Sequence, residues 1–164
     1  MSSHLILDAY NVIGALDRYR AADSFDAARQ LLVNDALKAA GWTGRIIIVV
    51  FDAQRASEPR KEEPRAGGAV RIVYSAPGES ADDEIERLIF KLEGSATVYT
   101  ADFALQRTAL ARGATRATPR EFANLLDELP VITRNPSKPF KVSVAQRLSA
   151  ETLRKLEEIR RKAE

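Results

Sequence analysis

The stretch LILDAYNVI at residues 5–13 decides which fold the sequence predicts. Its apolar run, Leu5–Leu7, is typical of a strand that is buried on both faces of a parallel sheet. Asp8 follows directly and stands at the carboxyl end of that strand, the edge where open parallel sheets bind their ligands. A carboxylate there is costly unless it is solvated, caps a helix or binds a cation. The sequence that follows indicates which of these roles Asp8 has.

The arrangement of a buried strand that ends at an acid recurs along the chain. The β-branched run at residues 46–51 is the clearest signal for a central strand, and Asp52 follows it. Shorter strands are predicted at residues 70–74, 96–100 and 114–117. Strands alternate with helical patterns throughout, which indicates an α/β domain whose helices cover both faces of a mainly parallel sheet.

Helical patterns separate these strands. Helices are predicted over residues 25–40, 81–93, 103–112 and 119–129. Ser24 is a suitable N-cap for the first helix, Gly41 is expected to end it, and Trp42 is expected to enter the core. Residues 14–23 are polar and irregular, and residues 54–68 combine charge with proline and glycine, so both segments are predicted to be loops.

The last part of the chain differs from the rest in composition. Residues 130–164 are predicted to form a proline-containing arm and a basic C-terminal helix, beyond a first domain at residues 1–129. From Arg134 to the end, nine lysines and arginines stand against four glutamates. Such a segment suits a polyanionic partner, and it equally suits a solvated helix.

The composition excludes several kinds of chemistry. The chain has no cysteine, so it has no disulfide, thiolate nucleophile or cysteine-based zinc site. His4 is the only histidine, which excludes a histidine pair and a serine triad built on histidine. No apolar run is long enough to span a membrane and no signal peptide is evident, so we expect a cytoplasmic protein. Catalysis has to rest on carboxylates, hydroxyls, amides and cations.

Four successive strand units bring acids toward the same edge of the predicted sheet. These acids are Asp8, Asp52, the pair Asp82 and Asp83, and Asp102. The helix dipole explains one or two acids at a helix start, but the segment 82–86 holds four. Uncompensated carboxylates repel one another, and a hard divalent cation such as Mg²⁺ or Mn²⁺ relieves that repulsion. Such an ion also activates water for attack at phosphorus.

The segments around these acids resemble the NYN nucleases, which are relatives of the PIN domain, and most of all their YacP-like subgroup. Residues 8–13 resemble the D-G-Y-N-V-I opening of that subgroup, and 51–53 its V-F-D-A segment. Residues 80–88 are similar to its T-A-D-x-x-I-E-R segment, 99–102 to V-T-S-D, and 112–114 to a G-A pair. Together these blocks cover about residues 5–129.

The resemblance implies a three-layer, PIN-like α/β/α fold with strand order 3-2-1-4-5, and a Mg²⁺- or Mn²⁺-dependent endoribonuclease. Members of the subgroup associate with ribosomes and cut messenger RNA, so RNA and the ribosome are the implied partners. The motif match gives the metal-ligand candidates Asp8, Asp82, Asp102, Asp52 and Asp83. Asp8, Asp82 and Asp102 are also the catalytic candidates, together with Asn11, which would position Asp8 or a phosphate.

Basic and aromatic side chains near this edge are candidates for contact with RNA. The basic candidates are Arg18, Arg20, Arg55, Arg60, Lys61 and Arg65. For each of them, an ordinary solvated charge is the alternative. Tyr10 is able to stack on a base or to pack under the first loop. Arg29 is a candidate for substrate contact or for a surface salt bridge, and Glu86 for support of the metal site or an ion pair.

Two other functions fit parts of the sequence. One is an RNA- or ribosome-binding module without activity, although a pure binder would gain affinity for RNA by losing the acids. The other is a Mg²⁺-dependent phosphatase or receiver domain. That phosphatase type needs a second acid two residues after its nucleophilic aspartate, and residue 10 is tyrosine. A receiver needs adjacent acids at the end of strand one, where only Asp8 stands. Hydrolysis by metal-activated water is therefore the predicted mechanism.

Overall fold

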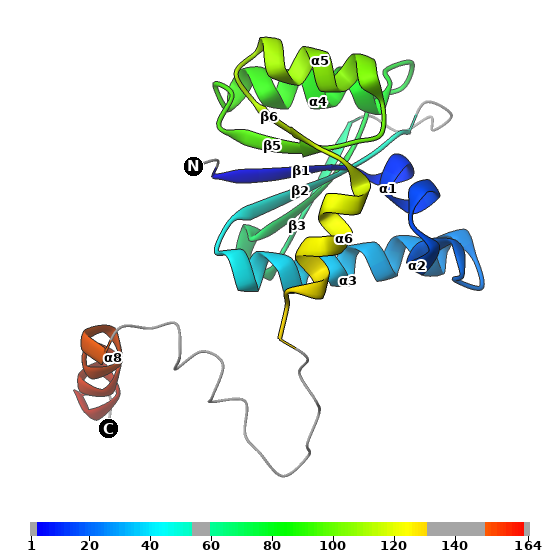
Figure 1. Cartoon of the computed structure of the whole chain (residues 1–164). Coiled ribbons are helices and arrows are strands. Elements are labelled where there is room, and N and C mark those ends of the chain that lie inside the picture. The colour runs from blue at the N-terminus through cyan, green and yellow to red at the C-terminus, as the bar shows by residue number, and fades with distance from the viewer. Residues whose placement is uncertain (1–2, 54–59, 131–149, 163–164) are drawn as a thin grey trace. The chain divides into compact units, whose positions relative to one another are not determined.

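The computed structural model describes residues 3–53, 60–130 and 150–162. The chain divides into two compact units, Met1–Pro130 and Val131–Glu164. In the second unit the described element is helix α8 (Ala150–Lys162), whose last turn is basic (Figure 1). No helix in the described parts of the chain is long and apolar enough to cross a membrane.

The first unit is built on a six-stranded sheet with the order β3-β4-β2-β1-β5-β6. The strands are β1 (His4–Asp8), β2 (Ile46–Phe51), β3 (Lys61–Arg65), β4 (Val70–Tyr74), β5 (Ala96–Tyr99) and β6 (Thr115–Ala117). All pairs are parallel except β3 with β4. The five parallel strands therefore follow the order 3-2-1-4-5 that the sequence analysis predicted, and β3 adds a sixth strand at one edge.

Helices cover both faces of this sheet, which confirms the three-layer architecture (Figure 1). The helices are α1 (Ala9–Ala15), α2 (Asp17–Arg20), α3 (Phe25–Thr43), α4 (Ala81–Lys91), α5 (Phe103–Ala111) and α6 (Pro119–Asp127), with a short 3₁₀ turn η1 (Ala66–Gly68). Helices α4 and α5 contribute to the hydrophobic cluster on one face. Helices α1, α2, α3 and α6 contribute to the cluster on the other face.

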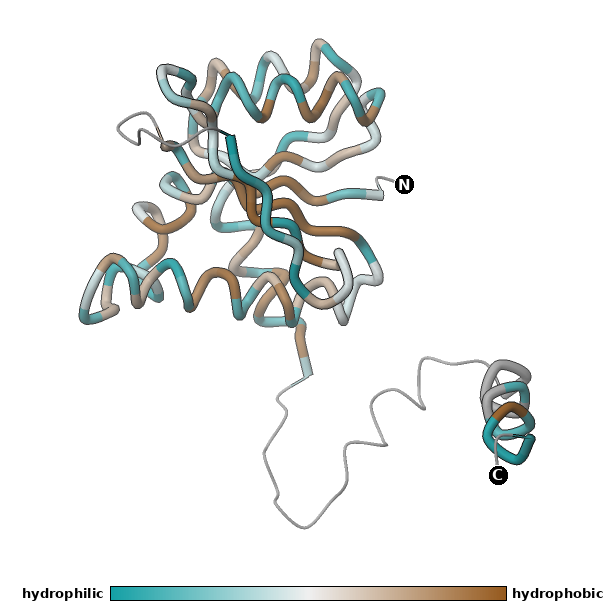
Figure 2. The backbone as a smooth tube through the Cα atoms, turned by 180° about the vertical axis from the view of Figure 1, so that it is seen from behind, coloured by the Kyte–Doolittle hydropathy of each residue, from teal (hydrophilic) through white to brown (hydrophobic). Residues whose placement is uncertain are grey.

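The central strands are apolar on both sides because both sides are covered. Leu5 and Leu7 of β1 belong to the cluster under α3, whereas Ile6 belongs to the cluster under α4, and all three are fully buried. The central strands are the most hydrophobic part of the chain trace in Figure 2. The register pairs Leu7 with Val49 of β2 and with Tyr99 of β5, so the carboxyl ends of these strands meet at one edge.

The prediction of an irregular segment at residues 14–23 is wrong for residues 14–20, because α1 begins directly after β1 and α2 follows it, and it is right for the turn at residues 21–23. Leu16 separates the two helices with an extended backbone. Each helix is too short to show a helical period in the sequence or to be stable alone. Packing stabilises them instead, since Val12, Ile13 and Tyr19 are buried.

The prediction of a loop over residues 54–68 is wrong for its second half, which contains β3 and η1. Strand β3 pairs antiparallel with β4, from Lys61 opposite Tyr74 to Arg65 opposite Val70. It lies at the edge of the sheet, where charged residues and a proline are tolerated because one side of the strand needs no partner. A charged edge strand therefore looks like a loop in the sequence.

The first long helix continues beyond its predicted end at Gly41. It ends at Thr43, and Gly44 takes the left-handed backbone conformation (φ 69°) that a helix C-cap favours. Trp42 consequently lies on the last turn of α3 and is 40% exposed, so its predicted place in the core is wrong. Phe25, at the other end of α3, is 46% exposed although it shares the helical spacing of the buried residues.

Candidate active site

Asp8 is the best-defined member of the predicted site. It is the last residue of β1 and precedes α1, and its side chain is only 2% exposed. Its Oδ2 accepts hydrogen bonds from Asn11 Nδ2 at 2.8 Å and from Thr100 Oγ1 at 2.9 Å. The pKa of Asp8 is raised to about 6, mainly by burial and also by the carboxylates of Asp82 and Asp102, while those two hydrogen bonds oppose the rise. Both described hydrogen-bond donors to Asp8, an amide and a hydroxyl, are neutral.

Thr100 connects the end of β1 to the start of α5. It is fully buried, donates to Asp8, and accepts a hydrogen bond from the backbone N–H of Asp102 at 3.1 Å. Gln106 on α5 donates in turn to the carbonyl of Thr100 at 2.7 Å. Sequence analysis did not select Thr100 or Gln106, although Thr100 lies within the block that resembles V-T-S-D. These contacts position Asp8 and Asp102 relative to each other.

Asp102 and Asp82 stand at the first turns of two helices on the same edge. Asp102 is the N-cap of α5, and its Oδ1 accepts hydrogen bonds from the N–H groups of Ala104 at 2.8 Å and Leu105 at 3.1 Å. Asp82 is half-buried in the first turn of α4. Burial raises its pKa, and Asp102, Asp83, Glu86 and Asp52 add to that rise in this order.

The acids that the sequence placed at this edge lie near enough to influence one another's pKa. Asp8, Asp82 and Asp102 affect one another electrostatically, and Asp52 acts on Asp82 as well. Asp8, Asp82 and Asp102 lie at the starts of α1, α4 and α5, whereas Asp52 follows β2. Gathered negative charge of this kind is unfavourable without a compensating cation.

Asp83 differs from its neighbour Asp82 in what its carboxylate contacts. Its Oδ2 accepts hydrogen bonds from the backbone N–H and the Oγ of Ser80, both at 2.9 Å, in a capping box at the start of α4. These hydrogen bonds lower the pKa of Asp83. The Asp83 carboxylate therefore caps the N-terminus of α4. This is the structural role that the helix dipole gives to acids at a helix start.

The donor set suits a hard divalent cation in its chemistry. It offers carboxylate oxygens from Asp8, Asp82 and Asp102, with Asp52 beside them, which are the ligands that Mg²⁺ and Mn²⁺ favour. As the described side chains lie, however, no three His, Asp or Glu residues are close enough together to hold a metal ion. The carboxylate oxygens of these residues and their combined negative charge suit a divalent cation.

The basic RNA candidates in the described residues are engaged with acids. Arg18 forms two hydrogen bonds of 2.7 Å with the buried Asp35, which also accepts one from Tyr19. Arg20 pairs with Asp17, and Arg60 with Glu84 and Glu62. Lys61 and Arg65 both pair with Glu63. Arg55 lies outside the described residues. Contact of these residues with RNA stays a prediction.

Arg29 and Tyr10 lie on the α3 side of the same edge. The Arg29 guanidinium is 4.7 Å from the centre of the Phe51 ring, donates to the Tyr74 hydroxyl at 2.9 Å, and is 3.6 Å from the Asp26 carboxylate. The salt-bridge alternative for Arg29 is thus present, together with an aromatic contact that the sequence did not indicate. Tyr10 is 40% exposed, so packing beneath the first loop does not cover it.

The three-layer fold and the acids at its carboxyl edge define a nuclease-like α/β domain. The family model of the YacP-like NYN domain matches residues 5–161, and the chain belongs to that family. Uncharacterized protein YacP of Bacillus subtilis (strain 168) is 32% identical over 168 aligned residues, which cover 96% of each chain. NYN domains are typically nucleases, which favours this class over the phosphatase and receiver alternatives.

Two crystal structures of Rae1 (YacP) from Bacillus subtilis have a similar fold, each with a TM-score of 0.64. One is 27% identical and covers 96% of this chain and 94% of that chain. The other, a tryptophan-to-leucine point mutant, is 29% identical and covers 77% and 76%. The family match also extends past Leu129, where the sequence resemblance had ended.

Proposed function

We propose that this protein is a Mg²⁺- or Mn²⁺-dependent endoribonuclease, with messenger RNA as its substrate and the ribosome as the place where it acts. The observation that carries the proposal is the environment of Asp8. This acid is buried, its hydrogen-bond donors are neutral, and its charged neighbours are Asp82 and Asp102. A fold that keeps such a carboxylate is stabilised by a cation that arrives from outside.

The residues of the site have separate tasks in this proposal. Asp8, Asp82 and Asp102 hold the ion, and Asp52 adds negative charge beside them. Asn11 and Thr100 orient the Asp8 carboxylate through Oδ2, and the first turn of α5 orients Asp102 through Oδ1. When bound, the ion supplies an activated water and stabilises charge at the phosphate. Hydrolysis leaves a 5′-phosphate and a 3′-hydroxyl.

The rival proposal is an RNA- or ribosome-binding module of the same family without activity. An acidic edge repels the phosphate backbone unless a cation is bound there. A binding module has no use for that repulsion, and a nuclease needs the acids. The sequence leads us to expect a cytoplasmic location for the nuclease and for the inactive binding module alike.

The test is cleavage of a 5′-labelled single-stranded RNA by the full chain in Mn²⁺ and in EDTA. Wild-type protein is expected to cut the RNA only with Mn²⁺, and Asp8→Asn to lose that activity. Asp127→Asn is the matched control, since this exposed aspartate lies at the far end of α6. Equal cleavage by wild type and Asp8→Asn would overturn the catalytic role. Uptake of Mn²⁺ by calorimetry separates the enzyme from a module that has lost its ion.

A further inference from the structure

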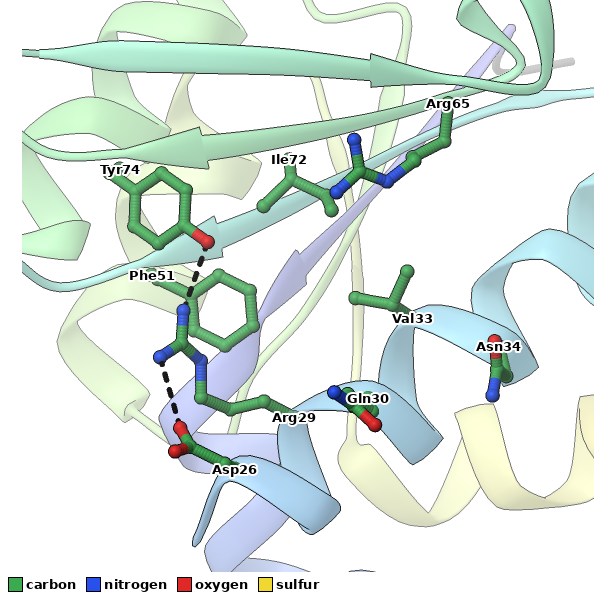
Figure 3. A pocket seen from close by; sticks show the side chains of 9 residues that line it. All are labelled: Asp26, Arg29, Gln30, Val33, Asn34, Phe51, Arg65, Ile72 and Tyr74. Carbon is green, nitrogen blue, oxygen red and sulfur yellow. Dashed lines mark hydrogen bonds and ion pairs between the residues drawn. The ribbon is translucent and has the colours of Figure 1, made fainter.

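A groove lies beside the acidic edge, between the first half of α3 and strands β2, β4 and β3 (Figure 3). Its volume is about 440 Å³. Arg29 and Tyr74 lie at the end of the groove near the acids, and Arg65 lies at the other end. The amide side chains of Gln30 and Asn34 line its α3 side. We refer to this feature as the Arg29 groove.

A row of four aromatic rings leads into the groove. Phe25 and Tyr10 are stacked, with centroids 5.3 Å apart and planes 7° from parallel. Tyr10 meets Phe51 edge-on at 6.0 Å, and Phe51 is stacked with Tyr74 at 5.6 Å. The inner ring, Phe51, is 1% exposed, whereas Tyr10 is 40% and Phe25 46% exposed. The outer pair therefore offers aromatic surface to solvent.

Cations are placed along the same groove. The Arg29 guanidinium lies over the Phe51 ring and is held by the Tyr74 hydroxyl. A guanidinium has five N–H donors, so one hydrogen bond to tyrosine and a 3.6 Å approach to Asp26 leave it able to bind a phosphate. Arg65 is half-exposed and 3.1 Å from Glu63. Aromatic faces and arginines together match a single-stranded nucleic acid.

Two of the aromatic residues that lead into the groove stand near acids of the edge in the chain. Tyr10 is the second residue of α1 and follows Asp8 by two positions. Phe51 is the last residue of β2 and precedes Asp52. An RNA strand whose phosphate lay at Asp8 would have Tyr10 and Phe51 within its neighbourhood, and the groove beyond them. This proximity selects RNA as the occupant over an unrelated peptide.

We propose that the Arg29 groove binds the nucleotide next to the cleaved phosphodiester, with its base on the Tyr10–Phe25 pair and a phosphate on Arg29. The inference rests on the proposed function, because it assigns the substrate of that same site. A base reaches an aromatic face only when it is unpaired, so the groove selects single-stranded RNA. Stacking accepts every base, so the selection of sequence is weak.

The test is the affinity for a fluorescein-labelled single-stranded 12-nucleotide RNA in EDTA, measured by fluorescence anisotropy on the full chain. Phe25→Ala is expected to weaken binding by roughly 5- to 150-fold, the range for loss of one base-stacking ring. Phe90→Ala is the matched control, because Phe90 is 69% exposed at the far end of α4. It is expected to change the affinity less than about twofold. Equal effects of the two variants would overturn the proposal.

An abasic RNA separates stacking from other causes. For a 12-nucleotide strand without bases, wild type and Phe25→Ala are expected to bind equally, because no base is present to stack. An equal loss on both strands would mean that Phe25 acts through the fold, and the stacking role would fall. Arg29→Lys is expected to weaken both strands about fivefold, since it keeps the charge and loses the planar fork. No effect on either strand would overturn the phosphate role of Arg29.

The groove and the catalytic proposal fail in different ways. If Phe25→Ala binds RNA like the wild type while Mn²⁺-dependent cleavage persists, the groove is not a nucleotide site and the nuclease stands. If wild type cleaves no RNA but Phe25→Ala loses affinity only for the strand with bases, the groove stands and the nuclease proposal falls.

Discussion

Asp8 and Glu84 are both buried carboxylates near the same edge of the sheet, and their surroundings differ in one respect. Glu84 is fully buried on α4, and its two oxygens contact Arg60 at 2.8 Å and Arg87 at 2.5 Å. Asp8 has only the amide of Asn11 and the hydroxyl of Thr100 as described donors. The chain supplies cations to Glu84 and supplies none to Asp8 within its described residues.

A third buried acid, Asp35, follows the pattern of Glu84. It is 1% exposed and is paired with Arg18 and Tyr19. Where a buried carboxylate joins elements of the fold, this chain pairs it with arginine. Among the buried acids that the structure describes, the exception is Asp8, whose charged neighbours are acids. Asp8 is thus a buried carboxylate without an arginine partner among the described residues, and this difference has measurable consequences.

The largest expected effect separates two adjacent acids. Asp82→Asn is expected to lower Mn²⁺-dependent RNA cleavage on the order of a thousandfold, because metal ions contribute several kcal/mol to phosphoryl transfer. Asp83→Asn is expected to lower it less than about tenfold, because that carboxylate caps α4. Initial rates on one labelled RNA measure both. Similar losses in the two variants would remove the distinction.

The next largest effect concerns Glu84, the buried acid that is paired with two arginines. Glu84→Gln is expected to lower the free energy of unfolding by about 3 kcal/mol, because Arg60 and Arg87 lose their shared carboxylate. Urea unfolding at neutral pH measures it. Glu86→Gln, in the same helix, is the control. A loss below about 1 kcal/mol would show that Glu84 is dispensable for the fold.

Asp8, which has no arginine partner among the described residues, is expected to behave in the opposite way. Burial raises the pKa of Asp8 from 3.8 to about 6, so the folded protein holds this proton more tightly than the unfolded chain does. The contribution of Asp8 to the free energy of unfolding therefore falls as the pH rises from about 4 to above 6. Without divalent ions, Asp8→Asn is expected to be more stable than wild type by about 3 kcal/mol at pH 8, and equal to it near pH 3. Urea unfolding across this range decides, and a destabilised variant at pH 8 would contradict the comparison.

The smallest effect is the stabilisation by the ion itself. Mn²⁺ at about ten times its dissociation constant is expected to raise the free energy of unfolding of wild type by about 1.4 kcal/mol. Asp8→Asn is expected to show almost no rise, whereas Glu84→Gln is expected to keep it. Thermal unfolding with and without Mn²⁺ measures the difference. An equal rise in wild type and Asp8→Asn would place the ion elsewhere.

Much of the fold was predictable because local patterns decided it. The apolar runs at 5–7 and 46–51 have no other stable place than a covered sheet, and their alternation with helices requires parallel pairing. Strand β3 was not predictable in this way. Its charged residues form a strand only because β4 offers them a free edge.

The candidate site divides along the same line. The types and positions of the acids follow from the sequence, since the carboxyl ends of parallel strands meet at one edge. What each acid contacts does not follow. Asp82 and Asp83 are adjacent in sequence, yet one faces other acids and the other caps its own helix. Tertiary packing made that choice.

By itself the sequence determined a parallel α/β sheet with its acids at one edge, because hydrophobic period and strand direction act over a few residues. The tertiary structure alone decided which buried acid is neutralised. Thr100 reaches Asp8 across 92 positions, and Arg60 reaches Glu84 across 24. Such contacts depend on distances in the folded chain, and no local pattern encodes them.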